Sequence, residues 1–159
     1  MQKAIWLQNW CGIVFSITLL SSFDEDEIGS KMTTNFISIR ADISIRQAMK
    51  ELIAQAAEND NISTIYVVDE TETLVGAIDL KDLIIARENM SLEDIIITSY
   101  PYVYANEQIE DCIERIKDYS EDSIPVLDSD NKLKGVLTAQ DITELVDDEM
   151  GDDYASLLP

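Results

Sequence analysis

Apolar and polar residues follow two periods along this chain. Short apolar runs typical of strands alternate with longer stretches whose apolar residues recur every three or four positions, as on one face of a helix. In the first half of the chain this pattern predicts strands and helices in the order β-α-β-β-α, at residues 36–39, 41–60, 64–69, 74–78 and 80–89. Asp42 or Ser44 can cap the first helix.

The inward faces of the predicted helices can be read from their spacing. The apolar positions of the first helix are Ile45, Ala48, Met49, Leu52, Ile53 and Ala56. The second half repeats the order, with a strand at 102–105, a helix at 107–122, strands at 123–128 and 133–138, and a helix at 139–150. In the helix at 107–122, the inward residues are Ile109, Cys112, Ile113 and Ile116.

The two halves are copies of one unit. Gly76 and Gly135 are separated by 59 positions, whereas Ile45 and Ile109 are separated by 64, so the first copy carries five extra residues near 57–63. A unit of this size has a small sheet with helices on one face, which is too little to bury both faces alone. We therefore expect an α+β fold in which the two repeats pack as one pseudosymmetric module with two related clefts.

The charge of the chain limits the kinds of partner that it can bind. With 32 acids against 11 bases the formal net charge is −21, and residues 88–159 hold nineteen Asp and Glu against four Lys and Arg. Such a surface does not bind nucleic acid, because phosphate contacts require Lys and Arg, and cations or a basic partner surface fit better. The chain has no His, and Cys11 and Cys112 form no paired motif, which favours a reduced cytosolic compartment. Without a nucleophile and base pair, we expect no enzymatic activity.

The first twenty-three residues are apolar and poorly explained by the repeat. The run from Cys11 to Leu20 is shorter than the roughly 20 residues that span a bilayer, although residues 4–7 extend it. A signal peptide would begin from Lys3, but no small-residue cleavage site precedes the acidic stretch at 24–27. Three alternatives stay open: a helix packed on the protein or a partner, a weak membrane or signal segment, and a remnant of a longer or altered gene start.

A polar box follows the second glycine in each repeat. In the second repeat Thr138 and Asp141 begin a helix, where a hydroxyl and free N–H groups can hold a phosphate and a carboxylate can accept ribose hydroxyls. The same pair is also an ordinary helix cap. In the first repeat Asp79 replaces the threonine and would repel phosphate, with Lys81 partly compensating beside Asp82. The two clefts are therefore chemically unequal.

The doubled sequence of strand, Asp, turn, Gly, two apolar residues and this box, over about residues 32–146, resembles a tandem pair of CBS domains. The flanking segments at 23–39 and 141–157 resemble those around the CBS pair of MgtE-type magnesium transporters. The resemblance implies a cytosolic module that senses Mg²⁺ and closes a channel when Mg²⁺ is high, and that in some members binds ATP. This chain differs from the family because most of its helical N-domain is replaced by the apolar segment and no channel follows, so we expect the sensor alone.

Acidic residues on the last helix suit such a sensor. Asp141, Glu144, Asp148 and Asp152 recur at steps of three or four and line one stripe, while Ile142, Leu145 and Val146 face inward. A divalent cation would relieve their repulsion, since Mg²⁺ takes one or two carboxylates plus waters. The alternative is a solvated acidic face with diffuse counterions. By the resemblance, the metal-contacting positions are Glu110, Asp141, Glu144, Glu149, Asp152 and Asp153. The nucleotide-binding positions are Asp79, Lys81, Asp82, Thr138 and Asp141.

The sequence thus predicts four segments: an apolar segment and acidic linker at 1–31, CBS domains at 32–90 and 91–146, and an acidic tail at 147–159. The expected function is a regulatory CBS pair of a magnesium transporter, with Mg²⁺ as regulatory ligand; the alternative is a stand-alone sensor of ATP or another adenine nucleotide. We expect a homodimer, a magnesium channel membrane domain as a partner, and a location in the cytoplasm or on the cytoplasmic face of the membrane.

Overall fold

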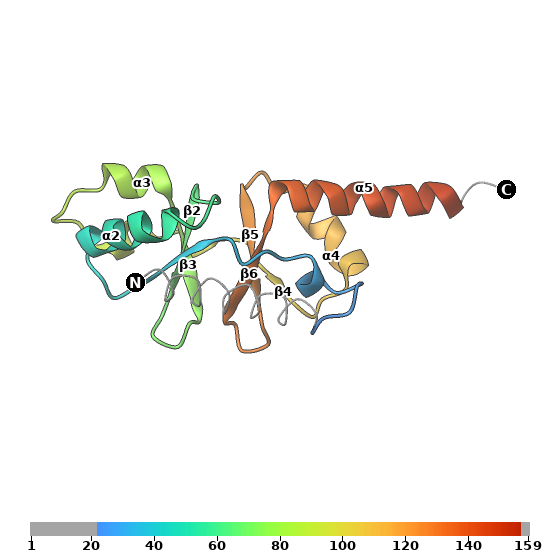
Figure 1. The fold of residues 1–159 in the computed structure, drawn as a ribbon, viewed down its shortest axis with the longest axis horizontal. Helices are drawn as coiled ribbons and strands as arrows, with labels where there is room; N and C mark the ends of the chain where they lie inside the picture. The colour runs from blue at the N-terminus through green and yellow to red at the C-terminus, as the bar shows by residue number, and fades with distance from the viewer. Residues whose placement is uncertain (1–21, 157–159) are drawn as a thin grey trace, which may run out of the picture.

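The computed structural model describes residues 22–156, with side chains described through Gly151. Two three-stranded sheets lie next to each other at the centre, and the helices of the two repeats lie at opposite ends of the molecule (Figure 1). This is the predicted α+β arrangement of two packed repeats. Within the described residues, no helix combines the length and apolar character needed to cross a membrane.

The first repeat contains every element that the pattern predicts. Its elements in chain order are β1 (Ile37–Arg40), α2 (Ile45–Ala56), β2 (Thr64–Val68), β3 (Leu74–Asp79) and α3 (Leu80–Ile85). β1 is parallel to β2, and β2 is antiparallel to β3. The helix α3 ends before the predicted residue 89, because the backbone turns to an extended conformation at Ala86. Ile53 was expected on the inward face of α2, but its side chain is 66% exposed.

The second repeat has the same topology. Its elements are β4 (Val103–Tyr104), α4 (Ile109–Ile116), β5 (Ser123–Leu127), β6 (Leu133–Thr138) and α5 (Ala139–Ser156). The helix α4 is shorter than predicted at both ends, because Gln108 is its N-cap and Lys117 its C-cap. The helix α5 runs past the predicted residue 150 and extends beyond the body of the molecule (Figure 1).

Each repeat receives a strand-like contact from the segment that leads into the other repeat. Thr33, which precedes β1, exchanges two backbone hydrogen bonds of 2.9 Å with Val136 in β6. Ile97, which precedes β4, exchanges equivalent bonds of 2.8 and 3.1 Å with Ala77 in β3. The two connecting segments therefore cross between the repeats and join the two sheets.

The acidic stretch before β1 also packs on the second repeat. It contains the short 3₁₀ helix η1 (Ile28–Ser30), and a second 3₁₀ helix, η2 (Leu92–Ile95), precedes β4. Ile28 and Met32 are buried in the hydrophobic core of the second repeat, where the free Cys112 thiol also lies. Apolar residues in a largely acidic segment thus anchor it to the repeat that follows much later in sequence.

A third core joins the two sheets. Tyr66, Ala77 and Val136 are buried there, and the hydroxyl of Tyr66 lies 2.5 Å from the hydroxyl of Ser123 in the other repeat. Burial is the main cause that raises the pKa of Tyr66 well above its usual range. Tyr100 donates its hydroxyl proton to the Ser123 carbonyl at 2.9 Å, and its ring meets that of Tyr66 edge to face. The junction between repeats is therefore apolar in packing and fully hydrogen-bonded at its hydroxyls.

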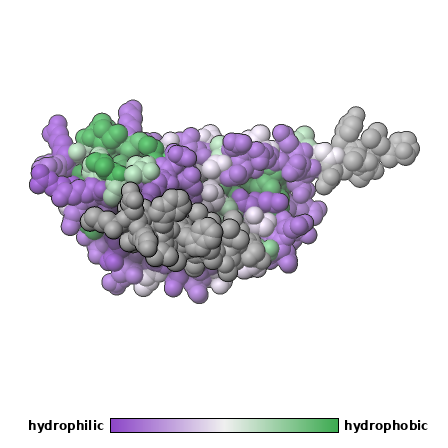
Figure 2. Space-filling view, viewed as in Figure 1, coloured by the Kyte–Doolittle hydropathy of each residue, from purple (hydrophilic) through white to green (hydrophobic). Residues whose placement is uncertain are grey.

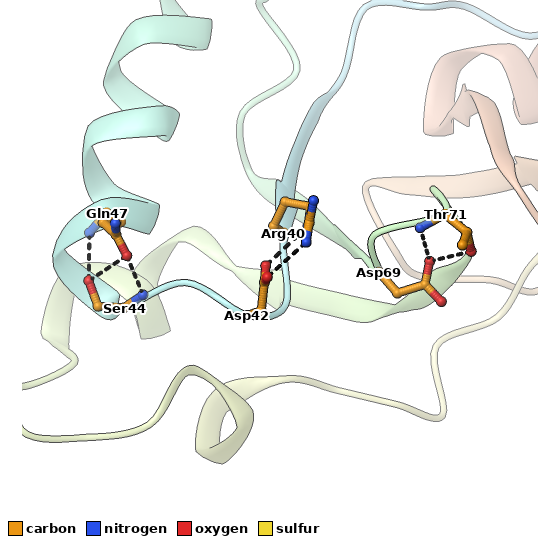
Figure 3. Close-up of polar contacts among 6 residues, drawn as sticks. All are labelled: Arg40, Asp42, Ser44, Gln47, Asp69 and Thr71. Carbon is orange, nitrogen blue, oxygen red and sulfur yellow. Dashed lines mark hydrogen bonds and ion pairs between the residues drawn. The ribbon is translucent and has the colours of Figure 1, made fainter.

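Local polar contacts set the ends of the elements in the first repeat (Figure 3). Of the two predicted caps, Ser44 is the N-cap of α2 and forms a capping box with Gln47. Asp69 closes the turn after β2 by accepting hydrogen bonds from the backbone and hydroxyl of Thr71 at 2.8 and 2.7 Å. These hydrogen bonds hold the pKa of the Asp69 carboxyl below its usual value.

Candidate functional site

A polar cleft lies where the segment before β1 reaches the start of α5. It has a volume of about 350 Å³ and is lined by Thr33, Asn35, Asp60, Asn61, Thr138 and Asp141. Two of these residues belong to the box that the sequence singles out, and the other four come from the first repeat. The cleft is therefore built by both repeats, as the packing of a duplicated unit predicts.

The box at the start of α5 is a reciprocal helix cap. The Asp141 carboxylate accepts hydrogen bonds of 2.8 Å from both the backbone N–H and the hydroxyl of Thr138, and the Asp141 N–H donates to the Thr138 hydroxyl at 3.2 Å. This confirms the capping interpretation of the box. Because one oxygen of Asp141 holds both donors of Thr138, the carboxylate is fixed at the edge of the cleft, where it can accept hydrogen bonds from ligand hydroxyls.

The opposite wall of the cleft is held in place by the segment before β1. The side-chain oxygen of Asn35 accepts a hydrogen bond of 3.0 Å from the Asp60 N–H, and Thr33 accepts one of 3.1 Å from the Asn35 N–H. Within the part of the chain that the structure describes, the side-chain nitrogen of Asn61 is buried without a hydrogen-bond partner. Leaving such a donor unpaired costs about 1–3 kcal/mol.

The corresponding box in the first repeat begins α3. Asp79 is the N-cap of α3 and accepts a hydrogen bond of 2.8 Å from the Lys81 N–H, while Asp82 lies in the first turn. Asp79 and Lys81 are exposed, and Asp82 is partly buried. The structure thus separates the five predicted nucleotide-binding residues into two places, with Thr138 and Asp141 at the cleft and the other three at α3.

An acidic hollow adjoins the cleft along α5. It has a volume of about 320 Å³ and is lined by Ser30, Lys31, Asp141, Glu144, Leu145 and Asp148. Ile142 and Leu145 are buried in the hydrophobic core of the second repeat, so the three carboxylates face outward as the helical spacing predicts. Glu144 accepts a hydrogen bond of 2.9 Å from Gln140. Asp141 lines both the hollow and the cleft, and so connects them.

The remaining predicted metal ligands are more dispersed. Glu110 is exposed in the first turn of α4, and Glu149 is partly buried on α5. The side chains of Asp152 and Asp153 lie outside the described residues. Among the described side chains, no three acidic or other metal-binding groups converge closely enough to hold an ion together. The predicted metal site is thus not preformed in this structure and stays a prediction.

Sequence reasoning missed four residues that line the cleft. Asp60 and Asn61 belong to the five-residue insertion of the first repeat, which was recognised as an insertion but given no role. Thr33 and Asn35 precede β1 and reach the cleft only because that segment crosses to β6. The position of the insertion was the one signal that could have pointed to the cleft.

Comparison with known proteins agrees with this architecture. The CBS domain family matches residues 26–89 and 92–148. The chain is 37% identical over 138 residues to the magnesium transporter MgtE of Enterococcus faecalis, covering 87% of this chain but 30% of that protein. It therefore spans about a third of the length of this curated relative.

Two solved structures have the same fold over most of the chain. One is the soluble part of a magnesium transporter, with a TM-score of 0.77 and 37% identity, covering 84% of this chain and 52% of that one. The other is the cytosolic domain of the Mg²⁺ channel MgtE in complex with ATP, with a TM-score of 0.74 and 28% identity, covering 82% of this chain and 52% of that one. The chain belongs to the CBS domain family, as a tandem pair related to the cytosolic region of MgtE magnesium transporters.

Proposed function

We propose that this chain is the regulatory CBS pair of an MgtE-type magnesium transport system, and that it senses Mg²⁺ to gate transport through a membrane domain. Its relatives, the absence of His in the sequence and the non-catalytic helix cap at Thr138 support a regulatory role without catalysis. In this role the chain acts in the cytoplasm or on the cytoplasmic face of the membrane.

The acidic hollow on α5 carries the proposal. Asp141, Glu144 and Asp148 line it together, and every charged residue of α5 is an acid. Like charges at this spacing repel by a few tenths of a kcal/mol per pair. A hydrated Mg²⁺ needs only one or two carboxylates, so it does not require a preformed cage of the kind that zinc occupies.

Regulation follows from this repulsion. In low Mg²⁺ the acidic faces keep α5 and whatever it meets apart, and in high Mg²⁺ the bound ions remove the repulsion. A ligand shifts a two-state equilibrium only by its differential affinity for the two states, and here the closely packed state binds Mg²⁺ better. Glu110, Glu149, Asp152 and Asp153 extend the acidic faces that would respond.

A second copy of the chain is the proposed partner on the opposite end of the molecule. Apolar atoms gather there over α2 and α3, at the upper left of Figure 2. Ile53, Ile84 and Ile85 are 66%, 60% and 65% exposed, which is unusual for isoleucine in a monomeric protein. An isologous pairing of these faces would bury them and give the homodimer expected from the sequence. Sedimentation velocity tests this, since Ile84→Asp with Ile85→Asp should convert a dimer to a monomer.

The melting temperature tests Mg²⁺ sensing directly. Mg²⁺ at ten times its dissociation constant should stabilise the chain by about 1.4 kcal/mol, which raises Tm by about 3–6 °C for a chain of this size. The reference is NaCl at matched ionic strength. Glu144→Gln with Asp148→Asn should remove the increment. Glu58→Gln with Glu70→Gln, an equal charge change on exposed residues that do not line the hollow, should preserve it. An equal response to Na⁺, or a full Mg²⁺ response in the α5 variant, would contradict the proposal.

The unpaired nitrogen of Asn61 favours a second candidate, an adenine-nucleotide sensor. In this proposal the Asn61 side chain turns toward a ligand in the cleft, which supplies the missing acceptor, and the hydroxyls of the ligand meet the carboxylates of Asp60 and Asp141. The residues that line the cleft include no Lys or Arg, so a phosphate there has no cationic partner other than Mg²⁺. Calorimetry should therefore show ATP binding that depends on Mg²⁺ and is lost in Asn61→Ala and in Thr138→Ala with Asp141→Ala. Binding that survives both variants would place the nucleotide elsewhere.

A further inference from the structure

A separate cavity lies between the hairpin end of β3 and the strand β4, on residues that neither proposal uses. Its volume is about 280 Å³, and it is lined by Thr73, Leu74, Val75, Gly76, Thr98, Tyr100, Tyr102, Tyr104, Leu127 and Asn131. The three tyrosines come from the end of the crossing segment and from β4, and all three line this cavity. Aromatic rings thus form one wall of the cavity, and Leu74, Val75 and Leu127 contribute apolar surface.

The tyrosine wall is held in place before any ligand arrives. Tyr104 donates its hydroxyl proton to the side-chain oxygen of Asn131 at 2.7 Å, and Tyr100 donates to the Ser123 carbonyl at 2.9 Å. The rings of Tyr102 and Tyr104 are nearly perpendicular, at 84°, with centroids 5.6 Å apart. They therefore form two walls of a corner, and the side chain of Tyr102 is 46% exposed at its open end. A wall fixed in this way loses little conformational freedom on binding.

The lining decides which chemistry the corner can accept. It contains no Lys or Arg that could pair with a phosphate or carboxylate. It also contains no Asp or Glu, and so lacks the carboxylates through which proteins usually bind Mg²⁺. The faces of tyrosine rings attract cations, most strongly those that shed water easily, such as alkylated ammonium groups. The net charge of −21 raises the local concentration of cations around the whole chain.

We propose that the corner formed by Tyr102 and Tyr104, with Tyr100 beside it, binds a small organic cation of the alkylammonium type. This site is independent of the acidic hollow and of the polar cleft, since neither of them shares a lining residue with it. It adds an organic cation to the Mg²⁺ and the nucleotide proposed above for the other two sites.

Choline and its uncharged isostere 3,3-dimethylbutan-1-ol test the proposal on the full chain. Backbone amide NMR spectra should show choline shifting the signals of Gly76, Thr98 and Tyr102, with NaCl at the same ionic strength as reference. The isostere, which has the same shape without the charge, should bind about 5- to 30-fold more weakly. Equal binding of the two compounds would reduce the site to an apolar hollow, and no shift with choline would remove the site altogether.

Single substitutions distinguish binding by the tyrosine rings from nonspecific attraction of cations to the negative charge of the protein. Tyr102→Leu should weaken choline binding about 5- to 30-fold, whereas Tyr102→Phe, which keeps the ring, should bind nearly as well as the parent chain. Tyr119→Leu is the matched control, because Tyr119 is also exposed, at 36%, and lies in a different cavity. Loss of binding in the Tyr119 variant, or retention in Tyr102→Leu, would overturn the assignment.

Discussion

Replacement of Gly76 by alanine tests whether the close approach of a crossing segment requires glycine at this position of β3 and at the equivalent Gly135 of β6. A Cβ atom at position 76 would lie 2.5 Å from the carbonyl oxygen of Ile97 and 2.7 Å from a methyl group of Ile96. The first contact is with backbone, so relief requires the crossing segment to move away from β3. That movement stretches the two hydrogen bonds between Ala77 and Ile97.

The magnitude follows from these contacts. Overpacking costs about 1–3 kcal/mol, and weakening two hydrogen bonds costs about 0.5–1.5 kcal/mol each. The smaller loss of backbone entropy for alanine returns about 0.5–1 kcal/mol. We therefore expect Gly76→Ala to lower the free energy of unfolding by about 3 kcal/mol. Gly135→Ala should cost less, because its nearest neighbours include the flexible Met32 side chain at 2.7 Å, with the Thr33 carbonyl at 2.9 Å.

Urea unfolding followed by circular dichroism measures these changes in the free energy of unfolding, provided that its slope with urea concentration is the same in each variant. Gly151→Ala is the control, because a Cβ atom there meets nothing within 4 Å and the residue lies within α5. It should raise the free energy of unfolding by about 0.5–1 kcal/mol, as alanine does in a helix. If Gly76→Ala unfolds within 0.5 kcal/mol of the parent chain, the close crossing at Ile97 does not constrain the fold, and the reasoning fails.

Three further predictions concern hydroxyl, turn and carboxylate groups. Tyr66→Phe and Ser123→Ala should each lower the free energy of unfolding by about 1–3 kcal/mol, because each leaves a buried partner hydroxyl unpaired. The double variant should lower it by clearly less than the sum, and additive values in a double-mutant cycle would contradict a direct hydrogen bond. Glu72→Asn should raise the free energy of unfolding by about 0.5–1 kcal/mol, because Glu72 has a φ of 66° that asparagine adopts more readily; an unchanged urea midpoint would exclude strain there. The lowered pKa of the Asp69 carboxyl means that the ionised group stabilises the fold above its unfolded pKa of 3.8, and that this stabilisation is lost as the pH falls through the lower folded pKa. Asp69→Asn should therefore reduce Tm at pH 7 but have the same Tm as the parent chain near pH 2, and a constant difference in Tm would refute this link.

The doubled pattern predicted the topology well because it rests on local periods. All ten major strands and helices occur where the two periods place them, and the caps at Ser44, Asp79 and Thr138 follow from side-chain chemistry within one turn. Helix ends were less accurate: α3 ends where the backbone becomes extended at Ala86, although Ala86, Arg87 and Glu88 favour a helix by propensity, and α4 ends at Lys117. Ile53 followed the helical period but remains exposed, because spacing does not reveal whether a neighbouring element covers that face.

The sites were only partly predictable because they depend on contacts between distant segments. The cap at Thr138 and Asp141 was found, but its cleft partners Asn35 and Asn61 come from the other repeat and carry no motif of their own. The same holds for Ile28, an apolar residue in an acidic stretch, which is buried because the segment crosses to the second repeat. The tyrosine corner was missed for another reason: the spacing of three tyrosines along the chain does not show whether their side chains line a cavity.

The exchange of crossing segments at Thr33 and Ile97 means that the boundary between sequence repeats is not a boundary between folding units. A single repeat expressed alone would keep a crossing segment that normally pairs with the other repeat. Its own edge strand, β3 or β6, would lack the crossing segment that pairs with it in the intact chain. Two such halves, expressed as separate polypeptides, should find each other and reassemble, as matching fragments of one protein do. A single ancestral unit would have met the same need by exchanging arms with an identical chain, so gene duplication would have converted an arm-exchanged dimer into one continuous polypeptide.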